Sequence, residues 1–257
     1  MVNAVDDLGE TPAFTKPPRR VVSLVPSLTE AVASVDASVL VGATDYCTHP
    51  ASLDVARVGG TKYPTIDAIT ALKPDLVLAN VEENRAEDVA ELRKAGIAVW
   101  VTYPRTLDDA LVSLRNMYGA LAMDAPGWLD DAAAIWAEPP TPIAAKALVP
   151  VWRRPWVVLG SDTFAGDLLR RLGVSCLYVD ANERYPRPSI DELREQAPDL
   201  LVLPDEPYAF TDADGPEAFP GVPYALVDGR HLTWYGPTLA EARQVLTAQL
   251  RPAREAP

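Results

Sequence analysis

The sequence predicts an α/β protein made of two Rossmann-like lobes joined by a long helical segment. A similar stretch occurs twice, as TIDAITALKPDLVL at residues 65–78 and SIDELREQAPDLLV at residues 189–202. A second pair of similar stretches follows, GIAVWVTYP at 96–104 and GVPYALVDG at 221–229. Two copies are too few for a solenoid, so the repetition indicates two similar lobes.

Each copy of the repeat has the features of a helix followed by a buried strand. Thr65 and Ser189 stand where a hydroxyl can cap a helix by accepting a hydrogen bond from a backbone N–H. Pro74 and Pro198 cannot continue a helix and push the preceding residue towards extended geometry. The runs LVLAN and LLVLP that follow are short, apolar and branched, which is typical of strands buried on both faces of a parallel sheet.

The first lobe is expected at residues 19–105, after a lead-in at 1–18. It is expected to begin with a strand at 21–25, a helix with Thr29 in its first turn and a strand at 39–46. The first repeat follows. A charged helix then starts at EENR (82–85) and stops at Gly96, and a strand is expected at 97–104. The region 106–146 is different, because its apolar residues recur at helical spacing and it has no strand character. It is predicted to be a helical connector rather than a flexible hinge, and prolines at 139, 140 and 142 end it.

The second lobe is expected at residues 147–257. Two strands should flank the Trp-Arg-Arg-Pro-Trp segment at 152–156, and a helix should begin near Asp162. After the second repeat, the segment 231–237 is expected to be a loop that leads into a final helix. His231, in DGRHL (228–232), is expected before a strand and at the surface.

Composition excludes several classes of protein. The net charge is −13 and no basic cluster occurs, which argues against a nucleic-acid partner. No apolar run is long enough to span a membrane. The acidic N-terminal stretch lacks the apolar core of a secretory signal, so either the protein stays in the cytoplasm or its export signal lies outside this chain. Cys47 and Cys176 fit neither a disulfide framework nor a zinc motif and are expected to be buried thiols.

Eight short segments, each present once, follow one another along the chain in a characteristic order. They are RRVVSLVPSLTE (19–30), DYCTHP (45–50), EENR (82–85), VWRRPW (151–156), GSDTFAGDLL (160–169), RYP (184–186), LPDEPY (203–208) and LTWYGP (232–237). Together they resemble the cobalamin-binding members of the substrate-binding proteins of ABC importers. The resemblance covers nearly the whole chain and implies a class III periplasmic binding protein-like fold, in which a rigid helical backbone joins the lobes.

The resemblance also implies a ligand site in a cleft between the lobes, built from loops at strand ends, in keeping with the general rule for open α/β sheets. Several of the matching residues are aromatic, and large planar side chains suit a flat macrocycle. The cobalamin binders carry a tryptophan just before the first repeat, where this chain has GGTKYP, so Tyr63 is the expected substitute. The expected ligand-binding residues are Pro26, Ser27, Tyr46, His49, Tyr63, Glu83, Asn84, Trp152, Arg153, Trp156, Tyr185, Glu206, Tyr208, Trp234 and Tyr235.

Individual residues also have simpler interpretations. His49 could be an axial cobalt ligand, but with Cys47 alone it does not make a metal set, so no metal site is predicted and a loop histidine is the alternative. Arg153 could reach a ligand carboxylate, although loop arginines are usually solvated. Trp152 and Trp156 could equally be core residues, and Glu83 could belong to a solvated helix start.

Members of this family dock on a two-fold permease through one acidic residue per lobe. The register places Asp67 and Asp191 at these positions, where the relatives have glutamate. A matched pair suits a symmetric partner. An aspartate in the first turn of a helix is also favoured by the helix dipole, without any partner.

The predicted function is non-catalytic capture of cobalamin or a related corrinoid by a monomer that needs no cofactor and serves an ABC permease dimer. The resemblance places such a protein outside the cytoplasm, while the absent signal favours a cytoplasmic location. An iron-siderophore or haem carrier is the alternative of the same fold. A cytoplasmic enzyme or a ligand sensor is the alternative of another class; against an enzyme, Ser27 and Ser161 lie outside any Gly-x-Ser-x-Gly elbow and no phosphate loop is present.

Overall fold

The computed structural model describes residues 5–12, 16–139 and 143–251. Parts of the predicted lead-in (1–4 and 13–15) and the prolines at 140 and 142 lie outside the described residues. The chain forms two compact units, each with its own parallel sheet, as the two-lobe prediction requires. The first unit runs to Pro104 and includes Asp108–Asp130 and Tyr235–Pro237, and the rest of the chain forms the second unit. The predicted lobe limits at 105 and 147 stay predictions.

The first unit contains a five-stranded sheet in the order β3-β2-β1-β4-β5, with every pair parallel. Its strands are β1 (Val21–Ser23), β2 (Leu40–Ala43), β3 (Ala56–Arg57), β4 (Leu76–Asn80) and β5 (Val99–Thr102). The strand order reverses at β1, which has β2 on one side and β4 on the other. Such a switch point is where open α/β sheets bind ligands, at the carboxyl ends of the strands.

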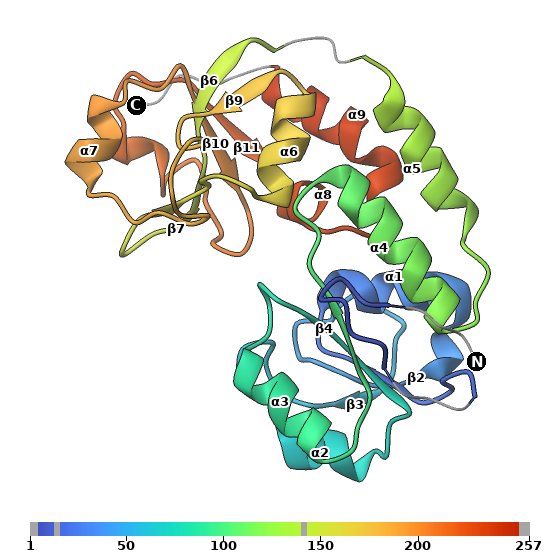
Figure 1. Cartoon of the computed structure of the whole chain (residues 1–257). Helices are drawn as coiled ribbons and strands as arrows, with labels where there is room; N and C mark the ends of the chain where they lie inside the picture. The colour runs from blue at the N-terminus through green and yellow to red at the C-terminus, as the bar shows by residue number, and fades with distance from the viewer. Residues whose placement is uncertain (1–4, 13–15, 140–142, 252–257) are drawn as a thin grey trace. The chain divides into compact units, whose positions relative to one another are not determined.

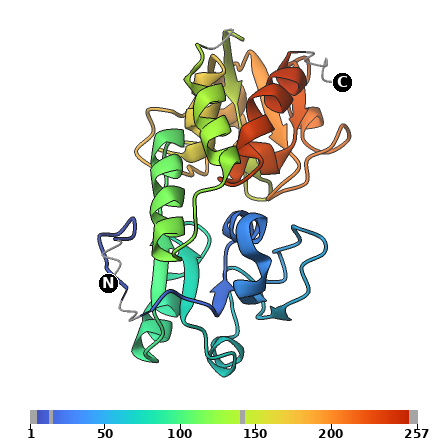
Figure 2. The same cartoon turned by 90° about the vertical axis from the view of Figure 1, so that its right-hand side faces the viewer.

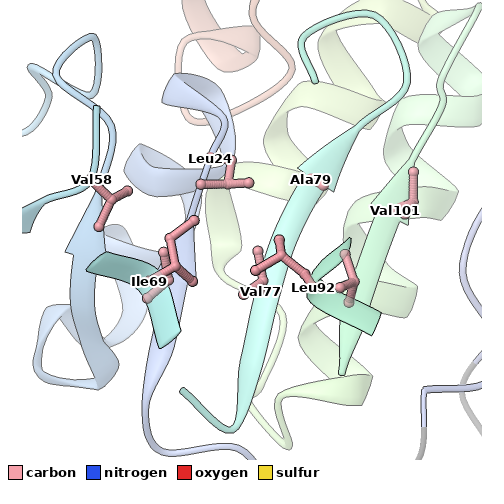
Figure 3. Packing of buried hydrophobic residues seen from close by; sticks show 9 residues of the cluster. Leu24, Val58, Ile69, Val77, Ala79, Leu92 and Val101 are labelled. Carbon is pink, nitrogen blue, oxygen red and sulfur yellow. The ribbon is translucent and has the colours of Figure 1, made fainter. Parts of the chain in front are cut away.

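Helices of the first unit pack on this sheet through apolar side chains. They are α1 (Pro26–Asp36), the 3-10 helix η1 (Ala37–Val39), α2 (Ile66–Ala71) and α3 (Ala86–Lys94). Figure 3 shows Ile69 of α2 and Leu92 of α3 beside Val77 of β4, and all three are fully buried. The strand β4 is buried along its whole length, as predicted for a strand in the middle of a parallel sheet.

The second unit contains a four-stranded parallel sheet in the order β11-β10-β6-β9. Its strands are β6 (Ala145–Leu148), β9 (Val174–Cys176), β10 (Leu200–Pro204) and β11 (Tyr224–Val227), and its helices are α6 (Phe164–Arg171), α7 (Ile190–Glu195), η2 (Pro216–Ala218), α8 (Gly229–Thr233) and α9 (Leu239–Leu250). Figure 1 shows these elements gathered around the sheet. The antiparallel strands β7 (Pro150–Trp152) and β8 (Val157–Val158) flank the Trp-Arg-Arg-Pro-Trp segment, as predicted.

The predicted connector is helical in two places, α4 (Leu107–Ala120) and α5 (Gly127–Ala137). In the first unit, the hydroxyl of Tyr118 on α4 donates a hydrogen bond of 2.8 Å to the carbonyl of Ala31 on α1. In the second unit, the indole of Trp136 on α5 donates one of 3.0 Å to the carbonyl of Leu239 on α9, and Figure 2 shows these two helices side by side. The helical spacing in this region therefore predicted the element type correctly.

The two copies of the repeat have the same backbone course. In each copy, a six-residue helix ends two residues before a residue of positive φ, Lys73 (48°) or Ala197 (46°), which precedes the proline. The side chain of Ser189 forms a capping box with Glu192, as its position predicted. The expected cap at Thr65 was wrong: within the described part of the chain its side chain makes no capping hydrogen bond.

Two other local predictions were wrong. Helix α3 begins at Ala86 rather than within EENR, because Oδ1 of Asn80 accepts hydrogen bonds from the backbone N–H groups of Glu82 (2.7 Å) and Glu83 (3.1 Å) and holds them in a turn. The segment that starts at Gly229 is a short helix, α8, whose first turn is capped by Asp228 through the N–H of His231. This helix buries the His231 side chain, which was expected at the surface.

Candidate functional site

Predicted site residues of the first unit follow three neighbouring strands at the carboxyl edge of its sheet. Ser27 comes after β1, Tyr46 after β2, and Glu83 and Asn84 after β4. Carboxyl ends of parallel strands meet at one edge, so the topology brings these residues to the same side of the sheet. Their exposure differs: Ser27 and Asn84 are buried, whereas 65% of Tyr46 is exposed. Pro26, the first residue of α1, is also buried.

Asn84 uses its side-chain amide within the first unit. Its Oδ1 accepts a hydrogen bond from the N–H of Asn80 (2.8 Å), and its Nδ2 donates to the carbonyls of Leu24 (3.3 Å) and Thr61 (2.9 Å). The amide thereby joins the ends of β1 and β4 to the loop before α2. This is a structural role, and direct contact of Asn84 with a ligand stays a prediction.

Tyr235 is buried at the same edge, although it lies far along the chain. Its hydroxyl oxygen is 2.7 Å from Nδ2 of Asn80 and 2.9 Å from Oγ1 of Thr102. Burial is the main cause that raises the pKa of Tyr235, so its hydroxyl stays protonated. Tyr235 therefore satisfies polar groups at the ends of β4 and β5.

Glu83 lies at this edge in surroundings that favour its neutral form. Burial raises the pKa of its carboxyl, Lys62 lowers it, and the neighbouring carboxylate of Glu82 raises it. The ammonium of Lys62 also donates a hydrogen bond to the backbone carbonyl of Glu82. Glu83 is thus a polar group with little opposing charge to hold it ionised.

Tyr63 and His49 lie in surface loops of the first unit. Tyr63 is 74% exposed, and the guanidinium of Arg85 lies 4.8 Å from the centre of its ring. Nδ1 of His49 is 3.1 Å from Oγ1 of Thr48. Across residues 5–12, 16–139 and 143–251 there is no group of three or more His, Cys, Asp or Glu side chains placed to hold a metal ion. Ligation of cobalt by His49 stays a prediction.

A chain of aromatic rings in the second unit runs from its core to its surface. The buried ring of Phe219 contacts Trp156 edge-on (5.6 Å between centroids), and Trp156 is stacked with Phe210 (6.2 Å). The ring centroids of Phe210 and Tyr208 are 4.7 Å apart. The ring of Tyr208 contacts that of Trp152 edge-on, with 5.6 Å between their centroids. Trp152 at the outer end is 45% exposed. The two predicted tryptophans are therefore parts of one aromatic cluster, with Trp156 packed against the core and Trp152 at the surface.

Arg153 contacts this aromatic cluster, and its guanidinium is paired with two carboxylates. Its guanidinium forms ion pairs with Asp214 and Glu217 and lies 5.1 Å from the centre of the Trp156 ring. The other oxygen of Asp214 accepts a hydrogen bond of 2.5 Å from the Tyr208 hydroxyl. That hydrogen bond is the leading cause that lowers the pKa of Asp214. Arg153 is thus neutralised by carboxylates of its own unit.

Glu206 and Trp234 meet near the ends of β10 and β11. The pKa of Glu206 is raised to about 7: burial is the main cause, Asp205 and Asp228 also raise it, and a hydrogen bond from Trp234 and the charge of Arg230 lower it. The Arg230 guanidinium lies 5.0 Å from the centre of the Trp234 ring. These surroundings therefore favour the neutral form of the Glu206 carboxyl.

Tyr185 lies in the loop before the second repeat and is 37% exposed. The guanidinium of the preceding Arg184 is 6.0 Å from the centre of its ring. The loop passes closely over Gly160, whose N–H donates to the carbonyl of Arg184 (2.8 Å). A side chain at Gly160 would clash with the backbone carbonyl of Glu183, so this glycine is needed to bring Tyr185 to its place.

Asp67 and Asp191 occupy equivalent positions in the two units. Each is the second residue of its helix, α2 or α7, and both are exposed. Asp191 lies 3.6 Å from Arg194, one turn further along α7. The equivalence supports the register of the repeat, and docking through these residues stays a prediction.

Sequence reasoning missed three residues of the second unit: Asp214 and Phe210, which contact the aromatic cluster, and Gly229, which lies against Glu206. Asp214 and Phe210 lie in the loop after β10, where no periodicity marks them, although LPDEPYAF does contain the aromatic pair. Gly229 comes two residues after the end of β11, and such a glycine at a strand-to-helix turn is a signal of close backbone approach.

The structure therefore brings the predicted residues together in two sets, one at the carboxyl edge of each sheet. The first set is centred on Tyr46, Glu83 and Tyr235, and the second on Trp152, Glu206 and Tyr208. A single ligand that contacts both sets stays a prediction. Within the described residues, no helix is long and apolar enough to cross a membrane.

Comparison with known proteins gives a consistent family. The family model described as "Periplasmic binding protein" matches residues 21–217. The vitamin B12-binding protein of Vibrio cholerae is 25% identical over 75% of this chain and 73% of its own length. An uncharacterised ABC transporter substrate-binding lipoprotein of Bacillus subtilis, YvrC, is 32% identical over 42% of this chain and 33% of its own.

Solved structures show the same fold. The periplasmic vitamin B12 binding protein BtuF of Vibrio cholerae superposes with a TM-score of 0.69 at 20% identity, over 91% of this chain and 97% of that one. The periplasmic haem-binding protein RhuT of Roseiflexus superposes with a TM-score of 0.71 at 20% identity, over 91% and 98%. The match of the family model to most of the chain, together with the two parallel sheets and the helical region, shows that this chain belongs to the periplasmic binding protein family.

Proposed function

We propose that this protein binds a corrinoid such as cobalamin reversibly, without catalysing a reaction on it, through residues at the carboxyl edges of both sheets. The observation that supports this most directly is the aromatic cluster of the second unit, whose outer members Trp152 and Tyr208 are held in place by the core and by Asp214. A preformed aromatic surface suits a flat macrocycle because it gives broad apolar contact at low entropic cost.

The relatives support the same ligand class. Several curated relatives carry the name vitamin B12-binding protein, although at 22–25% identity. The exposed Tyr46 and Tyr63 add aromatic surface on the first unit, which has no tryptophan at the position where the cobalamin binders have one. In the proposed site, Tyr63 takes that place and is kept near the edge by its contact with Arg85.

A titration with cyanocobalamin and hydroxocobalamin tests the proposal, read by tryptophan fluorescence and by calorimetry. We expect saturable binding with one corrinoid per chain. Trp152→Ala should weaken binding by about tenfold or more, because it removes the exposed end of the aromatic cluster. Trp128→Ala, which removes a tryptophan hydrogen-bonded to Ser34 in the first unit, is the control and should leave the affinity unchanged. Absence of binding at high micromolar corrinoid would exclude the proposal.

Haem or a ferric chelate is the second candidate ligand. Exposed tyrosines favour it, because a tyrosine phenolate is a known ligand of haem iron. The haem-binding protein RhuT also has this fold. Titration with ferric haem, followed by its absorption spectrum, distinguishes the two candidates: iron ligation shifts the Soret band, and Tyr46→Phe or Tyr63→Phe should abolish that shift.

An importer role is the biological setting that fits this binding function. YvrC is named as a substrate-binding lipoprotein of an ABC transporter, and Asp67 and Asp191 offer one exposed carboxylate on each unit. We propose that these carboxylates dock on a permease dimer outside the cytoplasm. The double variant Asp67→Ala, Asp191→Ala should keep its corrinoid affinity and lose uptake in cells that depend on this protein. Retention of the protein in the cytoplasm would instead favour a ligand sensor or an enzyme.

A further inference from the structure

Three carboxyl groups gather where β10 and β11 end. The two strands are parallel neighbours, with Pro204 paired to Val227. Asp205 and Glu206 follow β10, and Asp228 follows β11, so their backbones lie next to each other. The carboxylate of Asp205 accepts a hydrogen bond of 2.7 Å from the N–H of Gly229, which ties the two strand ends together.

Glu206 is held firmly within this group. A Cβ atom at Gly229 would lie 2.9 Å from both the backbone nitrogen and the backbone oxygen of Glu206, and closer still to its Cγ. Only a glycine allows the chain to pass this close. The Oε1 atom of Glu206 is buried and has no hydrogen-bond partner among the described residues, whereas the carboxyl accepts a hydrogen bond from Trp234. The side chain is therefore held in place and only partly exposed, so water screens its charge less than at an open surface.

The charge around Glu206 is predominantly negative. Asp205 and Asp228 disfavour its ionised form, and Arg230 favours it. Asp228 also interacts with His231, whose Nδ1 is 2.9 Å from Oδ1 of Asp228. The three carboxyl groups of Asp205, Glu206 and Asp228 thus lie near two basic groups, the Arg230 guanidinium and the His231 imidazole. Above pH 7 the ends of β10 and β11 therefore carry excess negative charge.

Arg153, which the sequence suggested as a partner for a ligand carboxylate, already forms ion pairs within the second unit. Arg153 is paired with both Asp214 and Glu217, and only 13% of its side chain is exposed. A ligand carboxylate would therefore have to compete with Asp214 and Glu217 for this guanidinium. The second unit therefore has an acidic edge, and the charge of its Arg153 is neutralised by other carboxylates.

We propose that Glu206 determines ligand specificity: it makes this edge accept a chelate whose periphery carries neutral amides and reject one whose periphery carries carboxylates. The inference rests on the proposed function, because it assumes that a metal chelate lies at this edge. A ligand carboxylate would have to approach like charges, and the partly buried charge of Glu206 is screened less by water than an exposed one, which makes that approach unfavourable. An amide carries no net charge and therefore does not meet this repulsion.

The test compares two matched pairs of ligands that differ only in peripheral groups. One pair is cyanocobalamin and its monocarboxylate, in which one peripheral amide is hydrolysed, and the other is haem diamide and haem. For the pair that binds, we expect the wild-type chain to prefer the amide form by about tenfold or more at about pH 8. Glu206→Gln keeps the size of the side chain and removes its charge. It should tighten binding of the carboxylate form and leave the amide form within about twofold.

The control and the pH dependence separate this effect from a general change of charge. Glu195→Gln, on the exposed face of α7, removes one carboxylate away from β10 and should leave the preference unchanged. Asp205, Asp228, Arg230 and the Trp234 indole face Glu206 in the wild type and in this control alike. The wild-type preference should shrink as the pH falls from about 8 to about 6, since Glu206 becomes neutral, and Glu206→Gln should lack that step.

The outcomes distinguish this inference from the proposed function. Equal preferences in the wild type and in Glu206→Gln would overturn the inference even if cyanocobalamin binds. Binding of only the haem pair, with the diamide preferred and the preference lost in Glu206→Gln, would support the inference and overturn the corrinoid proposal. Binding of neither pair by the wild type would overturn both.

Discussion

The hydroxyl of Tyr208 donates a hydrogen bond of 2.5 Å to one oxygen of Asp214, while the other oxygen of the same carboxylate pairs with Arg153. One carboxylate therefore orients both the ring of Tyr208, against which Trp152 lies, and the guanidinium that covers Trp156. Asp214 is a positioning residue for the aromatic cluster in the proposed site.

Tyr208→Phe tests this positioning. The variant keeps the ring and loses the hydrogen bond to Asp214, so the ring and its neighbour Trp152 become less fixed. We expect the near-ultraviolet circular dichroism of the tryptophans to weaken and the Kd for the bound chelate to rise about three- to tenfold. Tyr178→Phe, in the loop after β9, serves as the matched control. An unchanged spectrum and Kd in Tyr208→Phe would remove the positioning role.

Tyr235→Phe should destabilise the protein, because it deprives Asn80 and Thr102 of their shared hydrogen-bond partner in a buried place. We expect the free energy of unfolding to fall by about 1 to 3 kcal/mol, measured by urea denaturation of the full chain. The same substitution at the exposed Tyr46 should change it little. Equal effects at the two positions would show that the Tyr235 hydroxyl contributes nothing specific.

Two glycine-to-alanine variants should have opposite effects on stability. Gly229→Ala places a methyl group against the backbone of Glu206 and should cost about 2 kcal/mol or more. Gly119 lies inside α4, and a Cβ atom there would meet nothing within 4 Å, so Gly119→Ala should stabilise by about 0.5 to 1 kcal/mol through helix propensity alone. Thermal unfolding of both variants checks the signs. Tolerance of alanine at Gly229 would mean that β10 and β11 can separate at their ends.

The raised pKa of Glu206 predicts a pH dependence of stability that needs no ligand. In the folded chain its pKa is about 7, against an ordinary value of 4.5, so between these values the folded state binds more protons than the unfolded state. The stabilising contribution is fully present below about pH 4.5 and is lost as the pH rises through about 7.

Urea denaturation of the wild type and of Glu206→Gln from about pH 4.5 to about pH 8 measures this contribution. We expect Glu206→Gln to gain about 1 to 2 kcal/mol relative to the wild type over this range, less than full burial would give because the side chain is partly hydrated. A constant difference between the two proteins would show that Glu206 titrates at its ordinary pKa.

The sequence allowed the element types of the fold to be predicted, because local signals and tertiary packing agree in most places. Residues 65–78 and 189–202 form the same helix, left-handed residue, proline and strand. The caps were less predictable. Ser189 and Thr65 have equivalent positions, but only at Ser189 does a glutamate three residues later complete a capping box.

The candidate site could be predicted only as a set of residue types at strand ends. Nothing local in EENR shows that the Asn84 amide turns inwards to three backbone groups, or that Asn80 holds the two glutamates in a turn. Arg153 was interpreted as a ligand contact or a solvated residue, whereas its partners Asp214 and Glu217 lie more than 60 residues away. Such pairings depend on tertiary contacts that single-sequence patterns do not encode.

The position of Tyr235 has a consequence for how the protein is made. The first unit is built almost wholly from residues before Asp130, yet Asn80 and Thr102 share one further hydrogen-bond partner, the hydroxyl of Tyr235, that comes much later in the chain. A ribosome must therefore synthesise about a hundred further residues before this unit can be completed. Until then the nascent first unit holds two buried polar side chains that lack their native partner, so its final packing waits for the last part of the chain to emerge.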